Sequence, residues 1–157
     1  MSLARELGLR QPFATLEHEA LLNIYFSSTC IRKAAGRFLE PFGISDVQLN
    51  LLMMLHHQAG SDEGLNQAQL SEMMLVNRAN ITSLIDRMQR DGWVTRRTDP
   101  ADRRFNIIRL TPRARQLLER VEPLYAREVG RIMGALSPSE QRTLVEMLEK
   151  VRARMAQ

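Results

Sequence analysis

The sequence predicts a mainly α-helical fold with a small β wing. Over most of the chain, apolar residues recur at the i, i+3, i+4, i+7 spacing that is typical of amphipathic helices. Two short segments, 93–97 and 105–110, have the pattern of strands instead and are joined by a polar turn. Two short helical segments precede them, between residues 67 and 92. This order predicts a winged helix-turn-helix, a shape that enters nucleic-acid grooves.

Composition limits the class of protein. The 157 residues, 44% of them hydrophobic, suffice for one domain with a buried core. The net charge of +4 and the pI near 10.0 weakly favour an anionic partner, while 5% aromatic residues leave little for single-strand stacking surfaces. A single cysteine, Cys30, excludes an internal disulfide and suits a reducing compartment. No signal peptide or membrane span is recognisable, so we expect a soluble, cytoplasmic protein with no membrane partner.

The first part of the chain predicts an arm and two helices. Residues 1–14 have the composition of a loosely held arm, and residues 16–42 have that of one long helix. This helix is apolar on several sides, so several sides must be covered, and a second subunit is the natural cover. A capping box at Ser45 and Gln48 begins the next helix, which ends near Gly60. Its apolar side is formed by Leu49, Leu52, Met53 and His56.

The central stretch contains the two short helices. Asn66 and Asn77 suit their N-caps, because the asparagine carbonyl accepts a hydrogen bond from a first-turn amide. Gly92 suits the left-handed residue that ends the second helix, and we expect Trp93 to pack the wing against it. The two apolar stripes are Leu70, Met73 and Met74, then Ile81, Leu84, Ile85 and Met88.

Two further helices close the chain. Thr111 followed by proline predicts an N-cap, and Pro123 predicts a kink inside the helix that follows. A second capping box at Ser137 and Glu140 begins the last helix, with a stripe formed by Leu144, Met147, Leu148, Val151 and Met155. Both helices carry more apolar residues than the helices of a monomeric domain of this size would be expected to carry.

We therefore predict a single domain, 1–157, with two regions. Residues 45–110 form the winged-helix DNA-binding region, called the head below, and residues 12–42 and 112–157 form the dimerisation helices of a homodimer. Ten arginines and only four aspartates lie between Arg78 and Arg115, so the partner predicted for the head is double-stranded DNA.

The second helix of the head is predicted to read bases with the face opposite its core stripe. The base-reading candidates are Arg78, Asn80, Thr82 and Ser83, since contacts come mainly from the N-terminal part of such a helix. Arginine suits guanine, asparagine suits adenine, and the threonine methyl group can touch thymine. Arg87 lies further along and is expected at a phosphate or at the groove edge. The competing interpretation is a solvated polar helix face.

Three stretches carry a resemblance to a known family. They are 75–88 (LVNRANITSLIDRM), 91–94 (DGWV) and 99–104 (DPADRR). With Leu110-Thr111 they resemble the multiple-antibiotic-resistance repressor (MarR) family, and the likeness covers nearly the whole chain. It implies a homodimeric winged-helix transcription regulator, usually a repressor, which a small aromatic or phenolic ligand or the oxidation of a cysteine releases from DNA.

The resemblance also assigns the wing. It implies that Arg104 enters the minor groove while Asp102 pairs with it and shapes the turn. Arg96, Arg97 and Arg103 are expected to contact phosphates, which set register but not sequence. For Arg97 and Arg103, free surface charge is an equally good interpretation. Two-fold symmetry predicts a pseudo-palindromic operator with half-sites about 34–36 Å apart.

The nature of the switch stays open. The family implies an effector pocket, for which Tyr25, Ser28, Met53 and His56 are candidates, although each is more often core or helix surface. Cys30 is an alternative redox sensor, but an ordinary buried cysteine is favoured, because the peroxide-sensing cysteine of the family aligns with Leu21 instead.

Other function classes have weaker support. His18, His56 and His57 are not expected to form a metal site, because neighbouring helical residues point about 100° apart, and no cofactor is expected. The chain has no phosphate-binding loop, dinucleotide motif or nucleophile elbow, so we expect it not to be an enzyme. A winged-helix adaptor without DNA binding is the remaining alternative.

Overall fold

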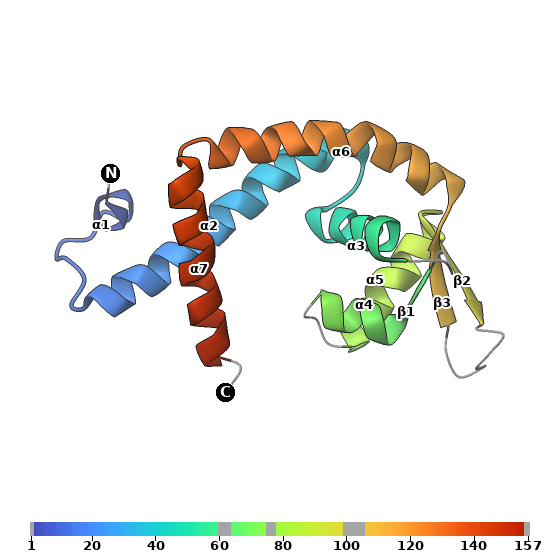
Figure 1. The fold of residues 1–157 in the computed structure, drawn as a ribbon, viewed down its shortest axis with the longest axis horizontal. Coiled ribbons are helices and arrows are strands. Elements are labelled where there is room, and N and C mark those ends of the chain that lie inside the picture. Colours follow the sequence, from blue (N-terminus) through green and yellow to red (C-terminus); the bar gives the residue numbers. More distant parts are fainter. Residues whose placement is uncertain (1, 60–63, 75–77, 99–105, 156–157) are drawn as a thin grey trace.

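The structure is a computed structural model that describes residues 2–59, 64–74, 78–98 and 106–155. The helices form an arch, with α7 descending from one end and the winged head lying under the other (Figure 1). In chain order the elements are α1 (Leu3–Glu6), α2 (Leu16–Leu39), the 3-10 helix η1 (Glu40–Phe42), α3 (Asp46–Gln58), β1 (Leu65–Asn66), α4 (Gln67–Met73), α5 (Arg78–Arg90), β2 (Val94–Thr98), β3 (Asn106–Leu110), α6 (Pro112–Met133) and α7 (Pro138–Met155). The mainly α-helical class with a small wing is confirmed.

The predicted helix starts are confirmed wherever the structure describes them. At α3, the amide of Ser45 donates to Oε1 of Gln48 at 2.8 Å and the amide of Gln48 donates to Oγ of Ser45 at 3.3 Å. Asn66 forms the same kind of box with Gln69, and Thr111 accepts from the amide of Ala114. Each cap satisfies amides that have no partner within the helix. The cap predicted at Asn77 lies outside the described residues.

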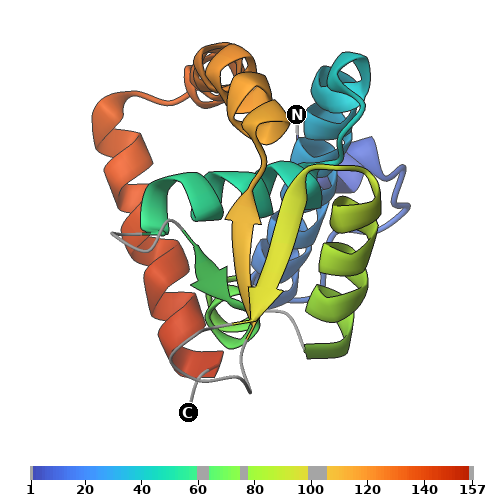
Figure 2. The ribbon, with the colours of Figure 1, turned by 90° about the vertical axis from the view of Figure 1, so that its right-hand side faces the viewer.

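The sheet has one strand more than predicted. β1, β3 and β2 form a three-stranded antiparallel sheet in that order, with Leu65 opposite Ile108 and Val94 opposite Leu110 (Figure 2). A strand of two residues leaves no periodic pattern in a sequence, which is why β1 was missed. Gly64 precedes it and runs close against β3, where a Cβ atom would lie 2.8 Å from the carbonyl oxygen of Ile108.

Among the described residues, a hydrophobic core fills the head and extends to the end of α2 and the first half of α6, and α5 contributes its predicted stripe to it. Ile81, Ile85 and Met88 are fully buried, and Leu84 nearly so. The stripe predicted for α4 is only partly right, because Leu70 is buried but Met73 is exposed.

The apolar side predicted for α3 needs a correction. Leu49 and Leu52 are buried as expected, but so are Leu51 and Leu55, whereas His56 is exposed. The reason is that α3 packs against β3 on one side and against α2 and α6 on others, so its buried surface is wider than one stripe.

The junction between α5 and the wing is a helix-ending motif with a buried tryptophan. Gly92 has φ +75°, its amide donates to the carbonyl of Gln89, and the amide of Trp93 donates to the carbonyl of Met88 at 2.9 Å. These two bonds define a Schellman motif, which requires a left-handed residue at this position. The Trp93 side chain is 6% exposed, and the guanidinium of Arg113 lies 4.1 Å from its ring centroid. The predicted packing role of Trp93 is confirmed.

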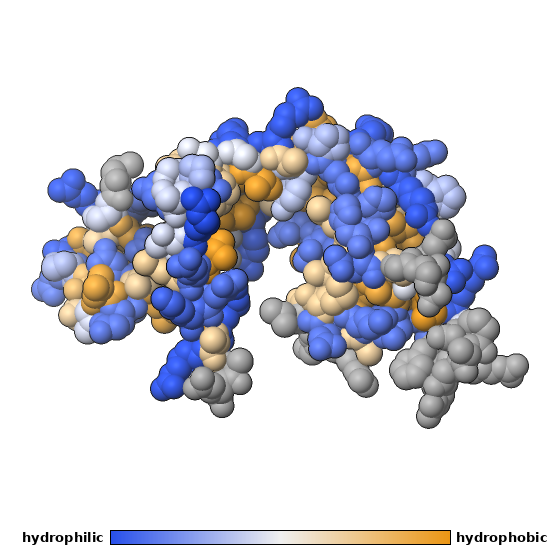
Figure 3. Space-filling view, in the orientation of Figure 1, coloured by the Kyte–Doolittle hydropathy of each residue, from blue (hydrophilic) through white to orange (hydrophobic). Residues whose placement is uncertain are grey.

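The end helices are long and expose apolar residues. α6 continues through Pro123 without a break and ends, as predicted, before Gly134, while the predicted arm contains the short helix α1. No residue of α7 is buried in the described chain, and hydrophobic side chains reach the surface along α2 (Figure 3). The exposed apolar residues are Leu16, Leu21, Ile24, Tyr25, Phe26 and Ile31 on α2 and Leu144, Val145, Met147, Val151 and Met155 on α7.

None of the helices in the described part of the chain combines the length and apolar composition that crossing a bilayer requires.

Candidate nucleic-acid interface

Three of the predicted DNA contacts share one exposed face of α5. Asn80, Ser83 and Arg87 are exposed and lie at i, i+3 and i+7, so they point to the same side of the helix. They line an open hollow of about 440 Å³ together with Ser45 and Val47 at the start of α3. The buried stripe on the opposite face holds α5 in the core, so this polar face is presented by a rigid element.

The other two residues predicted for the base-reading helix are placed differently. Thr82 is half-buried, and Nε2 of Gln67 donates a hydrogen bond to its hydroxyl oxygen. This bond joins the first turn of α4 to α5 and fixes the two helices of the helix-turn-helix against each other. Thr82 is therefore part of the helix packing as well as of the predicted reading face. Arg78 is the first residue of α5, and its side chain lies outside the described part of the structure.

The wing is tied to α5 by an ion pair that the sequence did not predict. Nη2 of Arg96, on β2, lies 2.5 Å from Oδ1 of Asp86 on α5. The Arg96 side chain is only 25% exposed, whereas Asp86 is 51% exposed. Arg96, which is predicted to contact a phosphate, pairs with Asp86 in this structure and so holds the wing beside the helix. Arg97, the next residue, is exposed. The predicted contacts at the wing tip, Asp102, Arg103 and Arg104, lie outside the described residues.

The four residues predicted for an effector pocket are not gathered in one place. Met53 lines a pocket of about 230 Å³ together with Ala35 and Tyr125. Tyr25 is 62% exposed and lies ten residues before Ala35 on α2, which corresponds to about 15 Å along the helix. Ser28 is also exposed, and His56 lies at the exposed C-terminal end of α3.

A second, more apolar pocket of about 230 Å³ lies between α2 and α6. It is lined by Ile31, Ala35, Tyr125, Glu128, Val129, Ile132 and Met133. Tyr125 contributes to both pockets. At the rim of this pocket, two hydrogen bonds from the Arg131 guanidinium, at 2.8 and 2.7 Å, lower the pKa of the Glu128 carboxyl. The rim therefore carries an ion pair, with Arg131 largely exposed to solvent.

Cys30 differs from the expectation of an ordinary buried cysteine. It is exposed on α2 in the single chain. The cause is the same as for its apolar neighbours: in one copy of the chain, this face of α2 is left uncovered.

Comparison with known proteins agrees with this geometry. A model of the MarR family matches residues 42–104, which cover α3 to the wing. The chain is 33% identical over 148 residues to YkoM of Bacillus subtilis, an uncharacterized HTH-type transcriptional regulator, covering 90% of this chain and 92% of that protein. It is 30% identical over 131 residues to the HTH-type transcriptional repressor YetL of the same organism, covering 81% and 77% of the two chains.

Solved structures share the fold. AbsC of Streptomyces coelicolor superposes with a TM-score of 0.82 at 18% identity, over 93% of this chain and 99% of the other. Sco3205 of the same organism, solved in complex with DNA, superposes with a TM-score of 0.79 at 24% identity over 91% of both chains.

Proposed function

Since this chain belongs to the MarR family of DNA-binding transcription regulators, we propose that it is a repressor that binds a pseudo-palindromic operator as a homodimer and is released by a small aromatic or phenolic ligand. The repressor role is supported by the likeness to YetL, which is named as one. The DNA-bound structure of Sco3205 supports duplex DNA as the ligand of the shared fold.

The exposed face of α5 carries the proposal. An α-helix fits the width of the major groove, and base contacts come from its first turns. Asn80 and Ser83 lie in these turns, and Arg87 lies one turn later, toward the groove edge. The Asp86–Arg96 pair places the wing beside the same helix. As the family resemblance implies, the wing tip with Arg104 then enters the adjacent minor groove.

The exposed apolar faces of α2 and α7 support the homodimer. A lone soluble protein seldom leaves large contiguous apolar patches in contact with water. A second copy of the chain, related by two-fold symmetry, covers both faces with equivalent residues. The two heads then read two half-sites on neighbouring turns of the duplex.

Selection of bound duplexes from random DNA, followed by fluorescence anisotropy, tests this function. We expect one two-fold symmetric sequence with half-sites about 34–36 Å apart, and affinity that falls steeply with salt. Small aromatic acids added to the complex are expected to release the DNA. Recovery of no preferred sequence would favour the adaptor alternative.

Two substitutions separate base reading from phosphate contact. Asn80→Ala should cost about 1–3 kcal/mol on the selected operator and relax the preference at one base pair. Arg87→Ala should weaken binding to all duplexes alike and reduce the salt slope by about 1. Arg120→Ala, which removes an exposed arginine on α6 outside the head, is the control and should leave both properties unchanged. If it matched Arg87→Ala, the effect would reflect net charge alone.

A further inference from the structure

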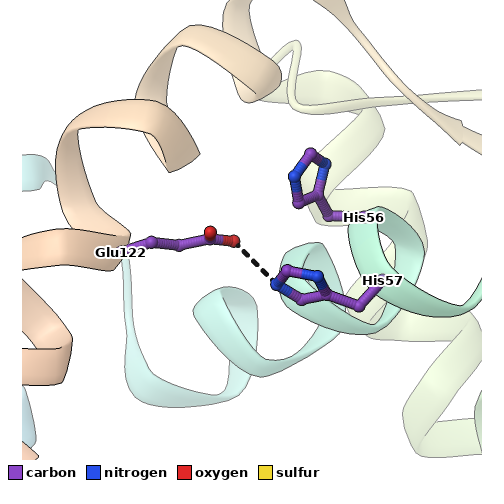
Figure 4. A group of neighbouring side chains, drawn as sticks. All are labelled: His56, His57 and Glu122. Atoms are coloured by element: carbon purple, nitrogen blue, oxygen red, sulfur yellow. Dashed lines mark hydrogen bonds and ion pairs between the residues drawn. The ribbon is translucent and has the colours of Figure 1, made fainter.

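Two histidines and a glutamate meet where α3 of the head packs against the middle of α6. His56 and His57 lie in the last turn of α3, and Glu122 lies on α6, 65 residues after His57. Nε2 of His57 is 3.1 Å from Oε1 of Glu122, and the two imidazole rings are 4.8 Å apart between centroids (Figure 4). One nitrogen of each ring and one carboxylate oxygen all lie within 4.8 Å of one another.

This convergence differs from the sequence expectation. Two adjacent histidines on a helix are expected to diverge, and the sequence does not predict that a carboxylate lies beside them. In the structure both rings lie on the side of α3 that faces α6, and the third ligand is a carboxylate (Figure 4). The remaining histidine, His18, lies near the start of α2 and is not a member of the group.

Two imidazoles and one carboxylate are a good donor set for zinc. Zn²⁺ takes His nitrogen at about 2.0–2.1 Å and carboxylate oxygen at about 2.0–2.2 Å, and a site with three protein ligands leaves a fourth position for water. Two donors on a tetrahedral ion are then about 3.4 Å apart. The His57–Glu122 separation of 3.1 Å is already close to this value.

The remaining adjustment is small. Donor separations of up to 4.8 Å require movements of about 1 Å to close around one ion. The side chain of His57 is 50% exposed and that of Glu122 is 27% exposed, so both have room to change rotamer and an ion has access from solvent.

We propose that His56, His57 and Glu122 bind one divalent transition-metal ion, with Zn²⁺ the best match to the donor set. The ion joins α3, which belongs to the head, to α6, which is one of the end helices. Cu²⁺ and Ni²⁺ also bind imidazole nitrogen well and compete for the same donors.

Calorimetric titration of ZnCl₂ into the full-length, tag-free protein tests the site. We expect one ion per chain, and at least about tenfold weaker binding in each of His56→Ala, His57→Ala and Glu122→Gln. His18→Ala removes the third histidine, and Cys30→Ser removes the exposed thiol, which also attracts zinc. Both controls should bind zinc like the parent protein.

Thermal unfolding supplies a second readout. Zinc that binds only the folded chain raises its melting temperature, and this rise should be lost in His57→Ala and kept in His18→Ala. Circular dichroism before titration shows whether each variant is folded, and an unfolded His57→Ala is replaced by His57→Gln.

The proposal is wrong if no site tighter than about 10 µM is found, or if the two controls weaken binding as much as the three ligand variants. The close approach of His57 and Glu122 is then only an interhelical hydrogen bond. The titration contains no DNA, so its outcome does not depend on the proposed operator binding.

Discussion

At the scale of single residues, the ion pair between Asp86 and Arg96 distinguishes two effects that a carboxylate can have on DNA binding. A carboxylate beside a DNA-binding face repels phosphates, so its loss alone should raise affinity. If its main effect is to hold Arg96 and the wing in place, its loss should lower affinity instead.

We therefore expect Asp86→Ala to weaken operator binding and to lower the free energy of unfolding by about 1 kcal/mol at most, because the pair is partly exposed. Asp91→Ala removes an equal charge from the residue that follows α5, away from Arg96, and should leave affinity unchanged or slightly raised. Anisotropy and urea unfolding measure the two effects. Higher affinity in Asp86→Ala would show that Arg96 needs no partner.

Substitution of Gly64 tests how closely the chain approaches β3 at this position. A methyl group at this position meets the side chains of Ile107 and Arg109 and lies 2.8 Å from a backbone oxygen, which cannot move without disturbing the sheet. Gly64→Ala should lower the free energy of unfolding by about 1–3 kcal/mol, a typical cost of overpacking. Gly36→Ala, at a helical glycine with no atom within 4 Å, should be neutral or stabilising by up to about 1 kcal/mol. Equal urea midpoints for the two variants would contradict the crowding at Gly64.

Single residues also show which features of the site can be predicted from the sequence and which cannot. The burial of Ile81 and Met88 and the exposure of Asn80 and Arg87 follow from helical periodicity, which is a local property. The ion pair of Arg96 with Asp86 does not follow from periodicity, because it depends on how β2 lies against α5. The three residues near α6 that come together in the proposed metal site depend on packing in the same way.

At the scale of elements, the N-terminal cap of α7 is expected to make the stability of this helix start depend on pH. The amide and hydroxyl of Ser137 donate to the Glu140 carboxylate, each at 2.7 Å, and these bonds lower the pKa of Glu140 below its ordinary value of 4.5. A carboxyl whose pKa is lower in the folded state stabilises that state at neutral pH. This contribution is lost as the pH falls from 4.5 through the folded-state pKa.

Glu140→Ala should therefore be less stable than the parent at pH 7, and the difference should shrink as the pH falls below 4.5. Glu146→Ala, which removes an exposed glutamate from the same helix but not from the cap, should show no such convergence. Urea midpoints followed by circular dichroism across this range measure it. A constant difference at all pH values would mean that Glu140 acts through helix propensity only.

The elements differ in how far they can be predicted. The caps at Ser45, Asn66, Thr111 and Ser137 are predictable because each uses residues three positions apart. β1 escapes prediction because its two residues are defined only by pairing with β3, more than forty positions later.

At the scale of the whole molecule, the uncovered faces of the end helices predict the assembly. Leu144 and Val151 lie seven residues apart on one face of α7 and are 37% and 42% exposed. Replacing both by serine should weaken the proposed homodimer at least about 50-fold, because the dimer loses four such side chains and each buries about two fifths of its surface, where full burial contributes about 1.5–3 kcal/mol.

The matched control is Arg142→Ser/Glu149→Ser. These two residues have the same spacing on another side of α7, and their joint replacement leaves the net charge unchanged. Sedimentation equilibrium should show a dimer for the parent and the control, and dissociation for Leu144→Ser/Val151→Ser. A monomeric parent protein would overturn the proposed assembly altogether.

The lack of any buried residue on α7 has a genetic consequence. If each copy of the chain completes the other, a copy with sound end helices but a damaged reading face still assembles with normal copies. Such an allele is expected to be dominant, because mixed pairs occupy only one half-site. In a cell that makes equal amounts of both, only about a quarter of random pairs would remain fully competent.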